Sequence, residues 1–378
     1  FAAENEKGKK RCRKLAKEKR FAIISKKRFC KKIEKEKGFA INFEKIIWRY
    51  METKIMSGQQ AFEAGAKLIN AGEVVVFPTE TVYGLGANAF DAEAVKKIFL
   101  AKGRPSDNPL IVHICDKSQI ADIVAVVTEQ AQKVIDAFMP GPITVILPKA
   151  NSIPYSVTAG LETVGIRMPS HEDARKFIAE CKTPIAAPSA NKSMHISPTT
   201  AQDVFEDMQG IVPLIIDGGA CQVGIESTII DMSTDIPTVL RPGAITVEML
   251  ASVLDSVQTF KGEVVVAKAP GMKYKHYAPS CDMVVATSLE KCVEEFDLQK
   301  SAGKNPIIIC KQEWLDKLAG RRSIVVGKNG EEVARNIYCA MHSGEKLSDL
   351  IICQDFGASG VYASVMNRVI KAAGGKKL

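Results

Sequence analysis

Four basic side chains stand at the ends of expected strands or helices, each close to a proline or a glycine. These residues are Lys102, Arg104, Arg167 and Arg241. Hydroxyl and amide side chains occupy comparable positions at Ser189, Asn191 and Ser227. Lysines and arginines are usually solvated at the surface, but their recurrence at element ends favours convergence on one crevice. Arginine forks match phosphate oxygens, so the pattern indicates a nucleotide site that works by positioning and charge stabilisation.

Two loops are expected to position these side chains. Residues 74–77 form a short apolar run that predicts a buried strand, and Pro78 ends it because proline has no N–H for a sheet ladder. The polar, glycine-rich stretch 79–89 is expected to be a loop whose backbone approaches a ligand closely. A second loop at 102–110 carries a lysine, an arginine and an asparagine. Open α/β sheets bind ligands at strand ends, so both loops are predicted to border the site.

Two other nucleotide-binding motifs fit poorly. Residues 84–89, Gly-Leu-Gly-Ala-Asn-Ala, match the G-x-G-x-x-A fingerprint of dinucleotide-binding folds. The first glycine lies well beyond the strand, however, and the next helix begins only after Asp91, so a pyrophosphate would miss the helix N-terminus. No G-x-x-x-x-G-K-[ST] sequence occurs, which argues against a P-loop kinase or GTPase.

A nucleophilic enzyme is a further alternative. Ser189, Ser227 and Cys221 are candidate nucleophiles, and His113 or His195 could act as the base. No G-x-S-x-G elbow is present. His113 also lies within an apolar run, where a histidine usually satisfies its hydrogen bonds inside the core.

The composition is ordinary for a soluble globular protein. The 378 residues are enough for two domains, with 46% hydrophobic and 25% charged residues. No apolar run approaches the roughly 20 residues of a membrane helix, and no secretory signal is recognisable. The ten cysteines are scattered, without the spacing of a zinc site, which favours reduced thiols and a cytoplasmic location.

The formal net charge of +8 is unevenly distributed along the chain. Residues 1–55 hold 19 Lys and Arg against 7 Asp and Glu, whereas the remainder holds 32 against 36. The first 55 residues are expected to be a disordered or non-native extension, because blocks of like charge are usually solvated. The mildly acidic remainder argues against the alternative that the protein is an RNA-binding module.

Three further segments are predicted beyond this extension. Residues 56–255 alternate strands and helices in a first α/β domain, with helices expected at 58–71, 92–101, 117–126, 128–138, 171–181, 199–208 and 246–254. Residues 256–280 are a linker with aromatic and basic side chains, unlike a plain polar spacer. Residues 281–378 alternate strands at 283–286, 307–310, 324–326 and 350–353 with helices at 289–300, 312–319, 331–342 and 359–373. This alternation predicts a small parallel α/β domain.

Five motifs occur in a fixed order in the first α/β domain. They are Pro78-Thr79-Glu80-Thr81-Val82-Tyr83-Gly84-Leu85, Lys102-Gly103-Arg104-Pro105, Ser189-Ala190-Asn191, Glu226-Ser227-Thr228 and Leu240-Arg241-Pro242-Gly243. Together they closely resemble the YrdC-like family of L-threonylcarbamoyl-AMP synthases. The linker sequence Lys273-Tyr274-Lys275-His276-Tyr277-Ala278-Pro279 and the C-terminal domain resemble the longer, two-domain members. The resemblance spans residues 56–378.

This resemblance implies a nucleotidyltransferase that makes threonylcarbamoyl-AMP and pyrophosphate from L-threonine, bicarbonate and ATP. The product would feed threonylcarbamoylation of a tRNA adenosine, so tRNA and downstream threonylcarbamoyl-transfer proteins are implied partners. The implied fold is a twisted, open mixed α/β sheet with a concave face, followed by a smaller Rossmann-like parallel α/β domain. Mg²⁺ is the implied cofactor, held through ATP rather than by protein side chains.

The resemblance also assigns residues by motif. The catalytic set matches Lys102, Arg104, Ser189 and Asn191. The ATP contacts match Arg104, Asn108, Thr163, Ser189, Ser197 and Arg241, with His276 or Tyr277 of the linker closing over the nucleotide. The threonine contacts match Thr81, His113, Arg167, Ala187 and Ser227. Met194 departs from the family pattern, which has glycine there, and its bulk is expected to narrow the loop beside Ser189 and Asn191.

Overall fold

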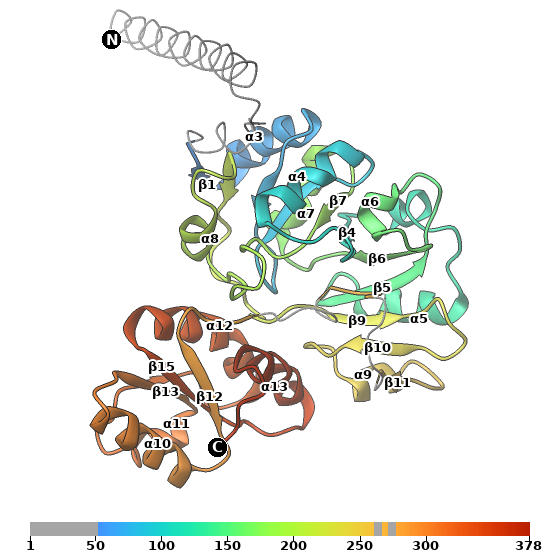
Figure 1. Ribbon diagram of the computed structural model, residues 1–378. Coiled ribbons are helices and arrows are strands. Elements are labelled where there is room, and N and C mark those ends of the chain that lie inside the picture. The colour runs from blue at the N-terminus through green and yellow to red at the C-terminus, as the bar shows by residue number, and fades with distance from the viewer. Residues whose placement is uncertain (1–51, 261–266, 271–276) are drawn as a thin grey trace, which may run out of the picture. The chain divides into compact units, whose positions relative to one another are not determined.

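The computed structural model describes residues 52–260, 267–270 and 277–378. Within these ranges, eleven strands form one mixed sheet in the order β1-β8-β2-β3-β7-β4-β6-β5-β9-β10-β11 (Figure 1). The strands are β1 (Lys54–Met56), β2 (Val75–Phe77), β3 (Gly84–Asn88), β4 (Ile111–His113), β5 (Ile143–Pro148), β6 (Thr163–Arg167), β7 (Ile185–Ala187), β8 (Leu214–Ile216), β9 (Thr228–Asp231), β10 (Thr238–Arg241) and β11 (Gln258–Thr259). The predicted basic extension lies almost entirely outside the described residues.

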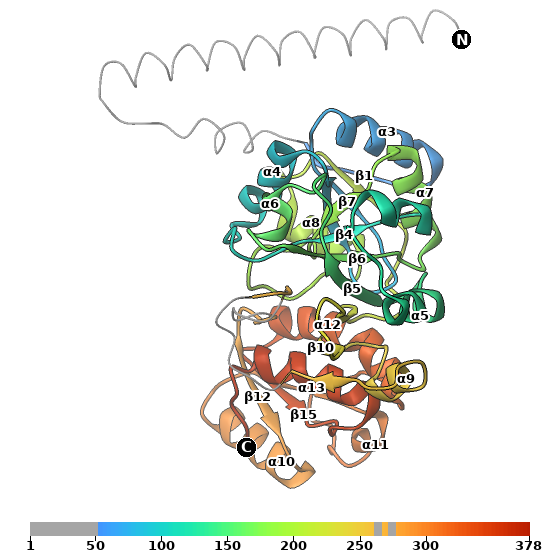
Figure 2. The same cartoon turned by 90° about the vertical axis from the view of Figure 1, so that its right-hand side faces the viewer.

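Helices connect and cover these strands. They are α3 (Gly58–Asn70), α4 (Ala92–Lys102), the 3-10 helix η1 (Lys117–Asp122), α5 (Glu129–Phe138), α6 (Tyr155–Thr158), α7 (Glu172–Cys181), α8 (Ala201–Met208) and α9 (Val247–Ala251). The apolar faces of α3 and α7 pack together against β2, β7 and β8. The two helices lie side by side in Figure 2. Helix α4 begins where expected, because the Asp91 carboxylate accepts hydrogen bonds from the N–H groups of Glu93 and Ala94.

The prediction of a glycine-rich loop at residues 79–89 is partly wrong. Residues 84–88 form strand β3, which pairs antiparallel with β2. The glycines are there for packing: a Cβ at Gly86 would lie 2.5 Å from Ile185 Cγ2 and 2.9 Å from Phe77 Cε1. The helix expected at 117–126 is also shorter, since η1 ends at Asp122. The short edge strands β1 and β11 carry no sequence signal and were not predicted.

The C-terminal residues form a separate four-stranded sheet, as predicted. Its strands are β12 (Asp282–Ala286), β13 (Pro306–Cys310), β14 (Ser323–Val325) and β15 (Leu350–Gln354). They run parallel in the order β12-β15-β13-β14. The helices are α10 (Leu289–Ser301), α11 (Gln312–Leu315), α12 (Gly330–Leu347) and α13 (Gly360–Ala372). The α/β fold class with a large mixed sheet and a smaller parallel sheet is thereby confirmed, whereas the domain boundaries stay predictions.

An apolar cluster joins the large-sheet part of the chain to the C-terminal part. Val82, Ile196 and Ile225 from the first part are buried together with side chains of α12, α13 and the parallel sheet. At this contact Gly224 adopts φ +77°, and a Cβ there would collide with the backbone of Arg335 in α12. Glycine is therefore required both for the backbone conformation and for the close approach of the helix.

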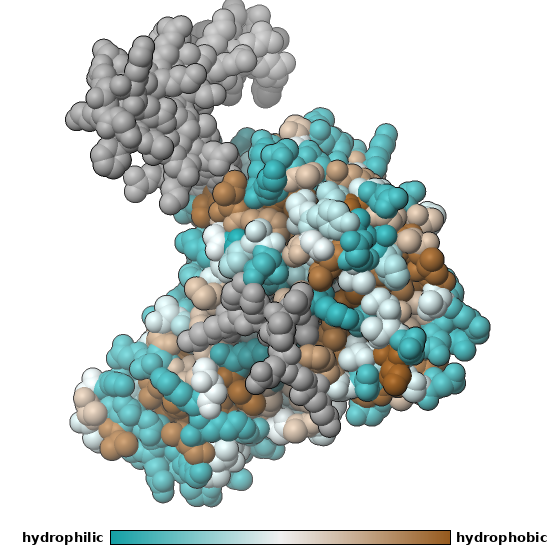
Figure 3. Space-filling model, turned by 45° about the vertical axis from the view of Figure 1, so that its right-hand side comes forward, coloured by the Kyte–Doolittle hydropathy of each residue, from teal (hydrophilic) through white to brown (hydrophobic). Residues whose placement is uncertain are grey.

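The outer surface is mixed in character. Hydrophilic residues predominate on the face shown in Figure 3, with apolar residues interspersed among them, as is usual for a globular fold. Among the described residues, no helix combines the length and apolarity that crossing a bilayer would need.

Candidate active site

Strand register brings several predicted site residues together. His113, at the end of β4, pairs with Arg167 at the end of the parallel strand β6. On its other side, β4 pairs with β7, where Ile111 lies opposite Ala187. These ends border a cavity of about 50 Å³. The predicted site residues that line it are Arg104, His113, Arg167, Ala187, Ser189, Ser227, Arg241 and Tyr277.

Other predicted residues lie outside the lining. Thr81 and Ser197 are buried, Lys102 ends α4, and Asn108 and Asn191 belong to two neighbouring loops. Thr163 stands at the opposite end of β6 from Arg167. His276 lies outside the described residues. The roles that the resemblance gives to all these residues stay predictions.

Arg167 and His113 form one buried corner of the cavity. Arg167 Nη2 lies 2.7 Å from Glu80 Oε1, and both side chains are almost fully buried. His113 Nδ1 lies 3.1 Å from the carbonyl oxygen of Ile111. Burial, and then the nearby Arg167 charge, lowers the pKa of His113 to about 3. The imidazole is therefore neutral near pH 7 and can hydrogen-bond a ligand without adding charge.

Ser227 is fixed from two neighbouring strands. Arg241 donates from Nη2 to Ser227 Oγ and from Nε to the Ser227 carbonyl oxygen, both at 3.1 Å. Thr144 Oγ1 lies 2.8 Å from the same hydroxyl. The Ser227 hydroxyl is thus held at the end of β9 with one side toward the cavity, where it can meet a small polar ligand.

Lys102 donates hydrogen bonds to the loop at 189–191. Its ammonium donates to the carbonyl oxygens of Ser189 (2.5 Å) and Asn191, and lies 3.3 Å from Asn191 Oδ1. Ser189 Oγ in turn donates to Asn191 Oδ1 at 2.6 Å. Burial, followed by the neighbouring Arg104 charge, lowers the pKa of Lys102 well below its usual value. In this structure the lysine therefore shapes the loop that carries Ser189 toward the cavity.

Met194 does not narrow that loop as expected. Its side chain is 53% exposed and lies outside the cavity lining. Its backbone adopts φ +75°, a left-handed conformation that glycine tolerates best. This explains why the family pattern has glycine here, since the position needs a backbone conformation rather than a small side chain.

Two segments of the predicted linker contribute to the cavity wall. Ala269 is buried against Ile111, Ile146 and Ile229 of the large sheet. Pro270, next to it, lines the cavity, and its carbonyl oxygen accepts a hydrogen bond from Arg241 Nη1 at 3.3 Å. Tyr277 closes another side of the cavity. These described residues of the linker therefore pack on the large sheet and border the cavity.

The sequence reasoning missed four charged or aromatic residues at the site: Glu80, Glu226, Tyr338 and Arg368. Both carboxylates belong to the quoted motifs, but the sequence analysis gave them no role. Tyr338 and Arg368 come from α12 and α13, more than 100 positions along the chain from Glu226. No local pattern in the sequence signals contacts over that separation.

Comparisons with known proteins agree with this architecture. A Sua5/YciO/YrdC family model described as "Telomere recombination" matches residues 67–243, and one described as "Threonylcarbamoyl-AMP synthase, C-terminal domain" matches 245–374. The threonylcarbamoyl-AMP synthase of Pyrococcus abyssi is 42% identical over 323 residues, which cover 82% of this chain and 93% of the relative. That of Bacillus subtilis is 43% identical over 327 residues, with 82% and 92% coverage.

Solved structures extend the likeness to three dimensions. The crystal structure of P. abyssi Sua5 complexed with L-threonine matches with a TM-score of 0.81 and 40% identity, and covers 86% of this chain and 98% of that one. The structure of a doubly substituted variant of the same protein also matches with a TM-score of 0.81 and the same coverage. On its motifs, its two sheets and these matches, the chain belongs to the threonylcarbamoyl-AMP synthase family.

Proposed function

We propose that this protein makes L-threonylcarbamoyl-AMP and pyrophosphate from L-threonine, bicarbonate and ATP. The observation that carries the proposal is the convergence of Arg104, Arg167 and Arg241 with Ser189 and Ser227 on one cavity. Three guanidinium groups beside two hydroxyls suit a ligand pair that brings a carboxylate and a triphosphate. The P. abyssi relative was solved with L-threonine, which supports threonine as one substrate.

Arg167 is the proposed partner of the threonine carboxylate, with the neutral His113 and the fixed Ser227 hydroxyl holding the polar atoms around it. Threonine carbamate, formed from the amine and bicarbonate, is unstable in water. Holding it beside the α-phosphate replaces a rare encounter with a positioned one. A carbamate oxygen then forms a bond to the α-phosphorus, and the bond from that phosphorus to the departing pyrophosphate breaks.

Arg104 and Arg241 would offset the negative charge that develops on the phosphates. Mg²⁺, when bound to ATP, would supply further charge neutralisation. Glu80 and Glu226 each already pair with an arginine, so these carboxylates leave the metal to the phosphates. Lys102 would act through the 189–191 loop that it holds.

We further propose that the enzyme acts in the cytoplasm on behalf of tRNA modification. Its described cysteines are all unpaired, which suits a reducing compartment.

The test is pyrophosphate release from ATP, with and without L-threonine and bicarbonate, at matched Mg²⁺. Release that requires both co-substrates is the expected result. Release that ignores threonine would overturn the proposed acceptor. No release from protein shown to be folded by its thermal transition would overturn the function as a whole.

A further inference from the structure

An arginine of the C-terminal domain contacts Glu226, a residue that lines the cavity. Arg368, on α13, has no exposed surface. Its Nε lies 3.1 Å from Glu226 Oε2, and its Nη2 donates to the Glu226 carbonyl oxygen at 3.2 Å. Its Nη1 donates to the carbonyl oxygens of Ser364 and Pro242. The guanidinium therefore grips both the side chain and the backbone of one residue of the large sheet's domain.

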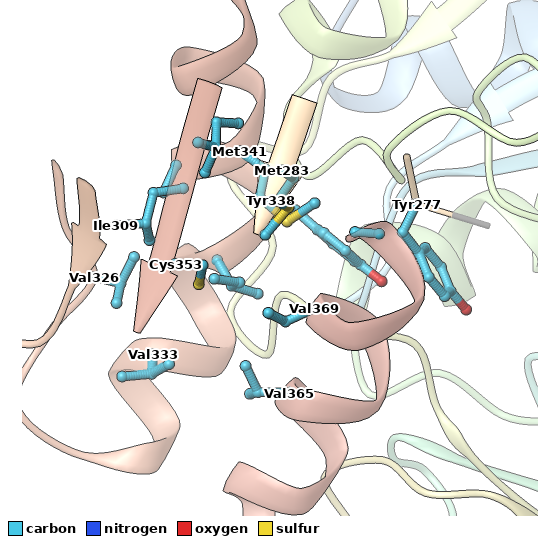
Figure 4. Close-up of a cluster of buried hydrophobic side chains, with 14 of the residues drawn as sticks. Tyr277, Met283, Ile309, Val326, Val333, Tyr338, Met341, Cys353, Val365 and Val369 are labelled. Atoms are coloured by element: carbon cyan, nitrogen blue, oxygen red, sulfur yellow. The ribbon is translucent and has the colours of Figure 1, made fainter. Parts of the chain in front are cut away.

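Tyr338, on α12, reaches the same carboxylate. Its hydroxyl lies 2.9 Å from Glu226 Oε2 and 3.1 Å from Oε1. Its ring stacks on the ring of Tyr277, with centroids 5.6 Å apart and planes inclined by 27°. Both tyrosines are labelled in Figure 4. Tyr338 thus joins Glu226 to the linker residue that closes one side of the cavity.

Glu226 connects these helices to the proposed substrate contacts. It lines the cavity itself, and its Oε1 accepts a hydrogen bond from Ser197 Oγ at 2.6 Å. It directly precedes Ser227, whose carbonyl and hydroxyl are held by Arg241. A shift of Glu226 would therefore displace Ser197 and Ser227 together.

We propose that Arg368 and Tyr338 are positioning residues of the active site, and that the C-terminal domain acts in the reaction by holding Glu226, and through it Ser197 and Ser227, in place. This inference rests on the proposed synthase function. It assigns to α12 and α13 a part in substrate binding through the site wall, without contact to the reacting atoms.

A role in docking the domains alone does not explain this cluster. The apolar contacts of Val82, Ile196 and Ile225 already join the two parts. A buried ion pair is a weak source of stability, since apolar side chains of similar volume often stabilise as well or better. What the charges add is a fixed geometry, because the guanidinium fork binds Glu226 in one orientation.

Electrostatics around Glu226 follow from the same contacts. Burial alone would raise the pKa of Glu226, but the charges of Arg368 and Arg241 and the hydrogen bond from Ser197 outweigh it and lower the pKa to about 2. The other titratable groups facing it are Tyr277, Tyr338 and Lys371. Removing Arg368 takes away the strongest opposing charge, so the pKa of Glu226 should rise.

The experiment measures pyrophosphate release for Arg368→Met, Arg368→Lys and Tyr338→Phe, at a temperature where each variant is fully folded. We expect kcat/KM for ATP to fall about 100-fold in Arg368→Met, the scale of a small misplacement of reacting groups. Arg368→Lys should recover part of the loss, because the charge returns without the fork. Tyr338→Phe keeps the stacked ring but loses a hydrogen bond to a charged group, so we expect a loss of about 10-fold.

The matched control is Lys346→Met. Lys346, also on α12, pairs with Glu206 across the same contact at 2.6 Å, but this pair is largely exposed and away from the cavity. It should leave turnover unchanged. If Lys346→Met lowers activity as much as Arg368→Met, general docking rather than positioning is responsible and the proposal is overturned.

The pH profile separates positioning from a loss of stability. In Arg368→Met the acid limb of kcat/KM for ATP should move to higher pH, because Glu226 now takes up a proton more readily. In Glu226→Gln/Arg368→Met that limb should return toward its original position, and the pair of changes should cost less than the product of the single effects. This double variant leaves no unpaired buried charge, so it also serves if Arg368→Met does not fold.

Assaying the unchanged enzyme first distinguishes a failure of the proposed function from a failure of the positioning role. No synthase activity in the unchanged protein contradicts the proposed function itself. An active unchanged enzyme with folded variants at normal kcat/KM and an unmoved pH profile overturns only the role of Arg368 and Tyr338.

Discussion

Arg167 Nη2 and Glu80 Oε1 lie 2.7 Å apart, with 5% and 2% of their side chains exposed. The carboxylate neutralises the guanidinium where no ligand carboxylate is present. A buried charge without a partner destabilises a protein. Glu80 therefore also offsets the free-energy cost of burying Arg167 before threonine binds. The pair couples ligand recognition to stability, and any substitution of one partner tests both.

Arg167→Ala should destabilise the protein by about 3–5 kcal/mol, because it leaves the Glu80 carboxylate buried and unpaired. Chemical denaturation measures this loss. The double variant Glu80→Gln/Arg167→Met removes both charges and should recover most of the stability. If Arg167 binds threonine, the double variant still lacks threonine-dependent pyrophosphate release. A stable double variant with an unchanged KM for threonine would contradict that role.

Arg104→Ala should reduce turnover by at least about 100-fold, the usual cost of losing one group that stabilises developing charge. Arg104 lines the cavity, and its Nη2 lies 3.2 Å from the carbonyl oxygen of Pro109. We expect the fold to survive this substitution. Pyrophosphate release and the thermal midpoint are the two measurements. Lys96→Ala, at an exposed ion pair with Glu93, is the control and should show neither change; near-normal turnover of folded Arg104→Ala would refute its role.

Acidification should destabilise the protein through His113. Its pKa is about 3 in the folded state against 6.5 in the unfolded chain, so between these values the unfolded state binds more protons. The contribution of the neutral His113 to the free energy of unfolding is therefore fully present above pH 6.5 and is lost as the pH falls toward 3. From pH 7 to pH 5 the loss should be about 2 kcal/mol. Denaturant titrations of the unchanged protein and of His113→Leu at both pH values measure it.

The His113→Leu variant should lack this share of the pH dependence. Glu226 does not interfere, because its pKa is about 2 in the folded state and its usual value is 4.5. Its stabilising contribution is therefore lost only as the pH falls below that usual value. Equal slopes for both proteins between pH 7 and pH 5 would show that His113 is not the group responsible.

Met194→Gly should raise the free energy of unfolding by about 0.5–1 kcal/mol, because glycine relieves the left-handed backbone cost while adding some chain entropy. The side chain buries little, since it is 53% exposed. Met249→Gly is the matched control: this methionine is also exposed but lies inside α9, where glycine should cost about 1 kcal/mol. Denaturation midpoints with opposite signs for the two variants are the expected outcome.

Helices and strands could be predicted where the spacing of apolar residues agrees with the residues that begin or end an element. The Asp91 cap and the apolar spacing after it define α4, and the strand–helix alternation after residue 281 defines the parallel sheet. Strand β3 escaped prediction because Gly84 and Gly86 read as a turn, whereas they make room for the Phe77 ring. That information lies in tertiary packing rather than in local propensity.

The convergence on one crevice could be predicted from the sequence, whereas the roles of its residues stay predictions. Arg104, Ser227 and Arg241 belong to the quoted motifs, and Arg167 stands at the end of an expected strand; all four line one cavity. The partners that hold them, such as Glu80 for Arg167, could not be inferred from residue type, because a carboxylate in an anion site reads as unfavourable. Arg368 is more remote still, since its contact with Glu226 depends on how α13 packs.

The apolar cluster of Val82, Ile196 and Ile225 with α12 and α13 also governs how the molecule comes apart. Separating the two parts would expose these side chains to water and leave Arg368 and Glu226 uncompensated. Separation therefore carries a free-energy cost for both parts, and we expect them to unfold together in one calorimetric transition. Damage to the C-terminal domain would then lower the stability of the catalytic pocket as well, although none of the pocket's proposed substrate contacts lies in that domain.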